Sequence, residues 1–362
     1  MIIGFGLNDS AQKIIYEYED IAGEAHAVAA SNINPYLVDS VNVALPSRSS
    51  PISQVPAILF GSKPTDGGHL LLSADEKNEL LTREPKIGAY LRTYLSAEEF
   101  LNGSPRYCLW LKDCSPNLLA NMPRVLERVD AVRKFRLAST KSATRDNASL
   151  PALFAEDRQP TTPFLAMPKT SSERRNWIPI GFLSPDTVIA SELFSVQRAS
   201  PYHFGVLSST MHMAWTRYVC GRLKSDYRYS ASIVYNNFPW PDFPQSSKPD
   251  QPPVPVDKAK TAIETAAQMV LDVRAKFQTG NQPATLANLY DPLTMPPELL
   301  RAHQKLDAAV DKSYEASGGK KSYKSDAERV AFLFELYQKY TSLLPADTKK
   351  SKIRKPKSQD HA

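Results

Sequence analysis

Apolar residues recur three and four positions apart along several stretches of the chain, most regularly in its last third. Such spacing places apolar side chains on one face of a helix and therefore predicts amphipathic helices. A shorter helix is predicted to begin after Ser73, because Glu76 three residues later completes a capping-box pattern. The longer helices are predicted over residues 123–139, 210–220, 257–277, 297–314 and 325–344.

Short apolar runs separated by polar turns occupy much of the remaining chain and predict β-strands. One such run stands at the very start, over residues 2–5. Others lie at residues 107–111, 164–167, 177–182, 187–190 and 202–207. Because most strand-like runs precede the longest helices, the predicted fold class is α+β, with a mixed strand-rich domain followed by a small helical C-terminal domain.

A proline-rich segment separates these two regions. Seven prolines fall within residues 239–255, a composition typical of a semi-rigid connector. The chain is therefore divided into five parts: residues 1–30, residues 31–238, a linker over 239–256, a helical domain over 257–344, and a basic tail over 345–362 that is predicted to be disordered.

Length and composition limit the classes of protein to consider. With 362 residues, 42% of them hydrophobic and 23% charged, the chain is long enough for two or three ordinary globular domains. No run approaches the roughly 18 apolar residues of a membrane span, and the first residues carry no basic leader. A cytoplasmic protein without a membrane partner is therefore expected. The three cysteines lack CxxC spacing, which argues against disulfides and a zinc site.

Positive charge is concentrated in two segments. The formal net charge is +6, yet residues 106–145 alone carry +6, residues 345–362 carry +4 and the remainder is acidic. Dense local charge favours phosphate binding, although the tail is better interpreted as a solvated, disordered Lys-rich end. The helix over residues 123–139 is predicted to turn a basic face outward. Phosphate contacts are predicted there for Arg128, Arg133, Lys134 and Arg136.

Two further clusters carry side chains suited to DNA. Arg and Asn can read guanine and adenine edges, and Glu can accept a hydrogen bond from cytosine. Base contacts are predicted for the turn that contains Glu173, Arg174, Arg175 and Asn176. Phosphate contacts are predicted for the basic and aromatic cluster of Arg222, Lys224, Tyr227, Arg228 and Tyr229, through its three cations. A salt-bridged surface loop is the alternative interpretation of each cluster.

Candidate catalytic motifs are incomplete. Asn34-Pro35-Tyr36 resembles the Asn-Pro-Pro-Tyr loop with which N6-adenine methyltransferases grip a flipped base, but it is one proline short. The roughly 30 residues before it hold no Gly-rich turn able to seat S-adenosylmethionine. The six histidines lack metal-ligand spacing, and Asp186 lacks the Glu-x-Lys partner of a nuclease metal site. No catalytic, cofactor-binding or metal-binding residue is assigned.

Longer motifs resemble one known family. Residues 289–307 are similar to the C-terminal helical domain of the MmeI-like, type IIL restriction-modification DNA adenine methyltransferases of bacteria. Full-length members place a nuclease, a helical connector and an S-adenosylmethionine-dependent methyltransferase domain before that region. Five other segments resemble the target-recognition region of the same family: residues 32–39, 66–72, 126–139, 178–183 and 202–241.

The resemblance implies a sequence-specific recognition module whose partner is double-stranded DNA. Residues 31–238 would be the target-recognition domain, and residues 1–30 the remnant of the end of a methyltransferase domain. That domain, or a separate subunit, would be supplied from elsewhere, so S-adenosylmethionine is a cofactor of the full-length family and none is expected in this chain. Two alternatives stay open: a methyltransferase in its own right that uses Asn34, and a nonfunctional truncated remnant.

Overall fold

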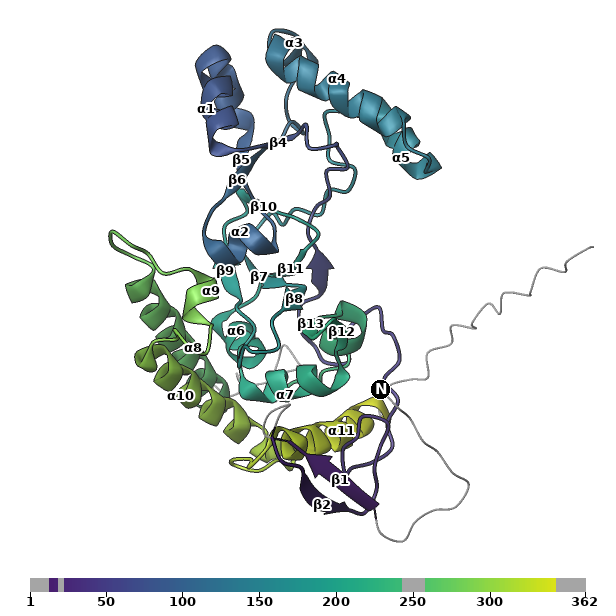
Figure 1. Ribbon diagram of the computed structural model, residues 1–362, viewed down its shortest axis with the longest axis vertical. Helices are drawn as coiled ribbons and strands as arrows, with labels where there is room; N and C mark the ends of the chain where they lie inside the picture. The colour runs from purple at the N-terminus through teal and green to yellow at the C-terminus, as the bar shows by residue number, and fades with distance from the viewer. Residues whose placement is uncertain (1–12, 19–22, 243–257, 343–362) are drawn as a thin grey trace, which may run out of the picture.

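The computed structural model describes residues 13–18, 23–242 and 258–342. These residues form an elongated body with a helical lobe at one end, a sheet in the middle and long helices toward the other end (Figure 1). The strand predicted at residues 2–5, most of the predicted linker and the basic tail lie outside the described residues. Short turns of 3₁₀ or π helix cover Pro85–Tyr90, Asn147–Ser149, Ala231–Tyr235 and Glu315–Ser317.

A four-stranded antiparallel sheet forms the middle of the molecule. Its strands follow the order β3 (Ile58–Phe60), β11 (Leu193–Gln197), β7 (Phe164–Pro168) and β9 (Gly181–Leu183). Every residue of β7 is buried, which explains why its sequence is a continuous apolar run without alternation. The strand predicted at residues 164–167 is thus confirmed, whereas only the end of the run at 177–182 forms a strand.

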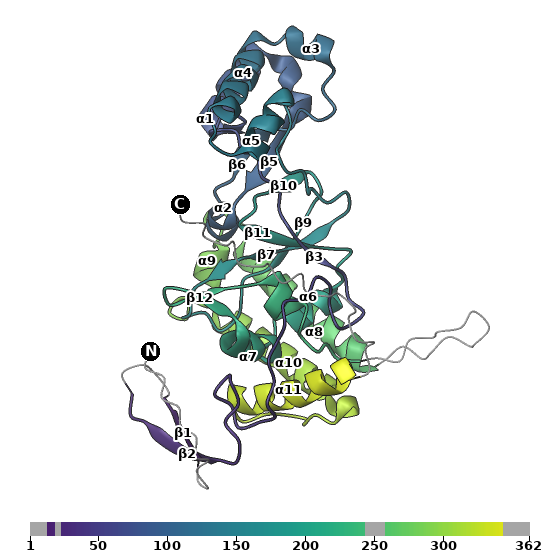
Figure 2. The same ribbon diagram turned by 90° about the vertical axis from the view of Figure 1, so that its right-hand side faces the viewer.

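Helices of the middle and C-terminal regions pack against this sheet and against one another. The predicted helices are confirmed within three residues at each end. In both views α8 and α10 run side by side, and α11 lies beneath α7 (Figures 1 and 2). The helices are α6 (Pro201–Leu207), α7 (Thr210–Val219), α8 (Lys258–Phe277), α9 (Leu286–Leu289), α10 (Pro297–Ser313) and α11 (Asp326–Ser342).

The strand predicted at residues 202–207 is wrong, because this run forms helix α6. Pro201 occupies the first turn, and the His203 ring accepts a hydrogen bond from the Ser200 backbone N–H at 3.0 Å. Gly205 lets α6 approach α8 closely, since a Cβ there would lie 2.7 Å from Ile263 Cγ2. The helix is buried on nearly all sides, so its sequence shows no polar face and reads as a strand.

One hydrophobic core runs without interruption from the sheet into the C-terminal helices. Phe164 and Phe194 of the sheet, Trp215 of α7, Val270 of α8 and Phe334 of α11 belong to the same buried cluster. The proline-rich segment therefore joins two stretches of chain that share a core. No helix of the described residues is long and apolar enough to cross a membrane.

The lobe at the far end has a core of its own, built on the sheet β10-β5-β6-β4. Val125, Val129 and Val132 of its longest helix are buried in this core. The Glu84 carboxylate accepts the backbone N–H groups of Arg124 and Val125 and so caps that helix. The elements are β4 (Leu71–Leu72), α1 (Ala74–Arg83), β5 (Leu91–Leu95), α2 (Ala97–Asn102), β6 (Arg106–Leu109), α3 (Pro116–Ala120), α4 (Pro123–Leu137), α5 (Ser142–Asp146) and β10 (Thr187–Ile189).

Arg136 holds this lobe together from within. It is fully buried on the inner face of α4. Its guanidinium has five N–H donors, and each meets a backbone carbonyl at 2.7–2.9 Å. The structure therefore corrects the prediction that Arg136 contacts phosphate, because no donor is left over and no atom is exposed. The carbonyls belong to Pro64, Thr65, Asn147, Leu150 and Leu153.

A separate two-stranded hairpin lies at the opposite end of the molecule, below α11 in Figure 1. It pairs β1 (Lys13–Glu17) with β2 (His26–Ala30) in antiparallel register. Its side chains are mostly exposed although many are apolar: Ile14 is 40% exposed, Tyr16 58% and Val28 42%. Within the described residues, no third strand joins this hairpin.

Replacing Arg136 with Leu should lower the free energy of unfolding by about 3 kcal/mol or more, because five buried carbonyls lose their donors. Arg133→Ala on the exposed face of the same helix is the matched control, and should change it by no more than about 0.5 kcal/mol. Urea denaturation of both variants measures the difference. Equal stabilities would show that the carbonyls of this lobe do not depend on Arg136.

Stability should also fall as the pH drops below about 6.5. Burial lowers the pKa of His203 to about 4 and that of His212 and His303 to about 3. Below the ordinary histidine pKa the unfolded chain binds protons that the folded protein does not, so each histidine costs about 1 kcal/mol of stability per pH unit. Asp307 acts in the opposite direction, since burial raises its pKa to about 6, but three histidines outweigh one carboxylate.

Urea unfolding at pH 7.5 and 5.5 tests this expectation. His303→Gln should lose less stability between the two pH values than the unmodified protein, while His26→Gln, at an exposed position, should lose as much. A pH dependence that His303→Gln leaves unchanged would contradict the assignment.

Candidate nucleic-acid interface

A small antiparallel sheet brings together the two clusters that the sequence analysis assigned to base and phosphate contacts. Its strands follow the order β12 (Gly221–Leu223), β13 (Asp226–Arg228) and β8 (Thr170–Ser171). Tyr227 pairs with Ser171 and Arg228 with Thr170. The turn over residues 171–176 therefore emerges beside the hairpin β12–β13, which follows α7 directly along the chain.

The hairpin β12–β13 presents cations on a rigid support. Arg222, Lys224 and Arg228 are all exposed. The Arg222 guanidinium lies 4.0 Å from the centroid of the buried Tyr227 ring and donates to the Ser225 carbonyl at 2.9 Å. Stacking of this kind fixes the direction of the charge without neutralising it.

Lys224 occupies the tip of this hairpin in a strained conformation. Its φ is 56°, in the left-handed region that lysine rarely adopts. A two-residue hairpin turn needs a positive φ, and glycine or asparagine normally supplies it. A lysine held in this conformation therefore places an exposed charge at the tip of the hairpin, at a local energetic cost.

The turn over residues 171–176 offers fewer free groups than the sequence analysis assumed. Arg174 and Asn176 are exposed, whereas Glu173 and Arg175 are half-buried. Burial lowers the pKa of Arg175, and the nearby carboxylates of Asp291 and Asp226 act against that effect. The Glu173 backbone N–H donates to Asp226 at 3.4 Å, which ties the turn to the hairpin.

The end of this turn is anchored on helix α10. The buried Trp177 ring stacks on His303 with centroids 4.4 Å apart, and its Nε1 donates to Asp307 at 3.4 Å. Asp307 also accepts from the backbone N–H and the hydroxyl of Thr210, both at 2.7 Å. Turn and hairpin thus keep fixed positions relative to the C-terminal helices.

The basic residues of α4 lie elsewhere, in the far lobe, and most of their charge is already neutralised. Both views separate α4 from β12 along the length of the molecule (Figures 1 and 2). Arg128 pairs with Glu76 at 2.5 Å and donates to the His69 carbonyl, and Lys134 pairs with Asp130 at 2.8 Å. In the described part of the chain, Arg133 is exposed and belongs to no ion pair. A basic face over this helix is therefore much weaker than its sequence suggests.

Lys169 borders the small sheet and was missed by the sequence analysis. Its ammonium lies 4.7 Å from the centroid of the Phe60 ring, which is 41% exposed on the edge strand β3. Burial lowers the pKa of Lys169, and the charge of Arg228 lowers it further. A single lysine directly after a buried strand carries no signal in sequence, because its neighbour Arg228 is 59 positions away.

The Asn34 side chain stabilises the loop that follows it. It is 2% exposed, and its side-chain oxygen accepts the backbone N–H groups of Tyr36 and Val38 at 2.9 and 3.2 Å. Its amide nitrogen donates to the Val41 carbonyl at 3.2 Å. These contacts shape the loop around Leu37, and they engage the oxygen and one of the two N–H donors of a buried amide.

Comparison with known proteins accounts for this architecture. The family described as "MmeI, target recognition domain" matches residues 39–242, and "MmeI, C-terminal domain" matches residues 254–345. DNA methyltransferase A of Bacillus subtilis (strain 168) is 36% identical over 342 residues, which are 94% of this chain and 36% of that protein.

A solved structure of the type IIL restriction-modification enzyme MmeI in complex with DNA is also similar. It shares 47% sequence identity and superposes with a TM-score of 0.81 over 93% of this chain and 42% of the MmeI chain. The chain thus spans well under half the length of both relatives. It belongs to the MmeI family, with the target recognition domain of that family at residues 39–242 and its C-terminal domain at residues 254–345.

Proposed function

We propose that the chain is the sequence-specific DNA recognition module of a bacterial restriction-modification DNA N6-adenine methyltransferase. The observation that carries this proposal is the sheet β12-β13-β8, which gathers exposed cations, and side chains of types able to read bases, from two distant segments onto one surface. Its relative MmeI was solved in complex with DNA, which supports double-stranded DNA as the partner. Work on DNA would place the protein in the bacterial cytoplasm.

The hairpin β12–β13 is the element best suited to a groove of DNA. The major groove admits a two-stranded β-ribbon, and this ribbon carries Arg222, Lys224 and Arg228 as exposed cations. These three side chains would hold phosphates, and Arg174 and Asn176 of the neighbouring turn would face base edges. Glu173 and Arg175 are half-buried in the same turn, so they would contribute to readout only where the turn exposes more of each side chain.

The hairpin β1–β2 fits a contact with a methyltransferase domain. A two-stranded hairpin is marginally stable on its own, and this one exposes Ile14, Tyr16 and Val28. We take residues 1–30 to be the end of that domain, whose remaining part would cover these apolar side chains. S-adenosylmethionine would bind to that domain, so that this chain recognises DNA without a cofactor of its own. The contacts of Asn34 speak against methyl transfer by this chain alone.

Lys224→Asn should weaken binding to all duplexes alike, because asparagine tolerates the left-handed backbone while the cation is lost. A duplex enriched from a random pool, and a scrambled version of it, would be titrated by fluorescence anisotropy over a salt series. The slope of log affinity against log salt should shrink by about one for each phosphate contact removed. Arg228→Gln should act in the same way.

Lys86→Gln is the matched control, since Lys86 is an exposed lysine of the far lobe. It should leave both the affinity and the salt slope unchanged. A loss as large for Lys86→Gln as for Lys224→Asn would assign binding to overall charge rather than to the hairpin. Failure of the unmodified chain to bind any duplex at low salt would overturn the proposed function.

Arg174→Ala or Asn176→Ala should relax the preference for one base position by about 1–3 kcal/mol and leave other positions unchanged. Repeating the random-pool selection with each variant measures this effect. Arg133→Ala, on the far lobe, should return the motif of the unmodified chain. An unchanged motif for both turn variants would remove the turn from base readout.

A further inference from the structure

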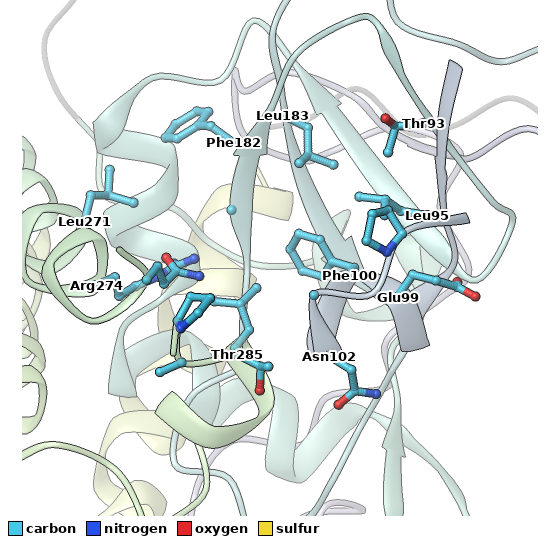
Figure 3. Close-up of a pocket in the computed structure, with 17 residues that line it drawn as sticks. Thr93, Leu95, Glu99, Phe100, Asn102, Phe182, Leu183, Leu271, Arg274 and Thr285 are labelled. Carbon is cyan, nitrogen blue, oxygen red and sulfur yellow. The ribbon is translucent and has the colours of Figure 1, made fainter. Parts of the chain in front are cut away.

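A cavity of about 780 Å³ lies between the recognition domain and the C-terminal helices. Its walls come from β5, α2 and β9 on one side, and from α8 and the segment that leads into α9 on the other (Figure 3). The cavity is distinct from the small sheet β12-β13-β8, because no residue of that sheet lines it. Its volume falls within the range of small-molecule sites.

The lining is apolar in its depth and polar at its rim. Phe100 and Leu286 are buried and contribute to the floor, and Phe182, Leu183 and Leu271 are partly buried. Asn102 and Gln278 are exposed and stand at the mouth. Such a gradient suits a ligand with an apolar body rather than a freely hydrated ion.

Two charged side chains line the cavity, and only one of them is balanced. Glu99 accepts from Arg106 Nε at 2.6 Å and from the Ser96 backbone N–H at 2.7 Å. Arg274 is 6% exposed and donates from Nη1 to the Ile180 carbonyl at 2.6 Å, while its Nε has no hydrogen-bond partner. No carboxylate of the described residues forms an ion pair with Arg274.

The surroundings of Arg274 hold its charge in place without neutralising it. The guanidinium lies 5.7 Å from the centroid of the Tyr290 ring and 5.9 Å from that of Phe204. Its Nη2 lies close to Gly181, where an added Cβ would be only 3.3 Å away. A buried charge without a counter-ion is costly, and a ligand anion in the adjoining cavity would offset that cost.

We infer that this cavity binds a small organic monocarboxylate, whose apolar body fills the space between α2, β9 and α8 and whose carboxylate pairs with Arg274. A single guanidinium with planar donors matches one carboxylate. A phosphate dianion would bring a second charge for which the lining offers no further cation.

The test compares 4-phenylbutyrate with its neutral isostere 4-phenylbutyramide, each titrated against the full chain by ligand-observed NMR. The carboxylate should bind about tenfold or more tightly than the amide. Arg274→Gln should abolish this preference. Gly181→Ala should weaken it, because the added Cβ crowds Nη2 and lies 3.6 Å from Phe100 Cζ.

Gly88→Ala is the matched control, because its Cβ would meet only Leu81 at 3.4 Å, far from the cavity. It should bind both probes like the unmodified chain. If Arg274→Gln does not fold, the comparison of Gly181→Ala with Gly88→Ala decides alone. Equal binding of the two probes, no binding of either up to about 5 mM, or an unchanged preference in Gly181→Ala would each overturn the inference. Binding of an acidic tripeptide but not of 4-phenylbutyrate would overturn it in favour of a polypeptide occupant.

Discussion

The candidate DNA-facing surface depends on one carboxylate, that of Asp307 in α10. It accepts two hydrogen bonds from Thr210, at the first turn of α7, and one from the indole of Trp177. A carboxylate is favoured at the N-terminal end of a helix, where backbone N–H groups lack partners. The same side chain therefore fixes both the helix that leads into the hairpin β12–β13 and the end of the turn beside it. The small sheet inherits its position from this contact, because β12 begins directly after α7.

The recognition region and the C-terminal region also share one hydrophobic core. Trp215 of α7 packs against Phe334 of α11, with ring centroids 5.4 Å apart, and Arg217 of α7 forms an ion pair with Asp326 of α11. Two C-terminal helices thus hold α7 in place: α11 through Trp215 and Arg217, and α10 through Asp307. Removal of these helices would expose the shared core rather than release an independent domain. The C-terminal region therefore fixes the position of the candidate DNA-facing surface.

Much of the helical structure could be predicted from sequence, and the site only in part. The long helices have regular apolar periods. The hydroxyls of Ser73 and Ser325 each accept a backbone N–H at the start of a helix, so these helix starts follow from local chemistry. The helix at residues 202–207 was mistaken for a strand, because a helix buried on nearly all sides shows no alternation of apolar and polar faces. The pairing of Thr170 with Arg228 joins segments 58 residues apart, and no local pattern announces it. The basic face predicted for α4 is likewise weaker than its sequence indicates, because Glu76 of α1 forms an ion pair with Arg128.

The residues that support the DNA-facing surface differ from the residues that would contact DNA, and this difference bears on how the recognised sequence could change. Trp177, Thr210 and Asp307 are held by several contacts each, so substitutions there would disturb the fold. Lys224 and its neighbours Arg222 and Leu223 are exposed at the tip of the hairpin and contribute little to the core. Substitutions at exposed positions usually change stability by no more than about 0.5 kcal/mol. The exposed residues of the hairpin can therefore change while the residues that support them stay the same. At position 224 the choice is narrower, because the left-handed backbone there favours residues that tolerate a positive φ.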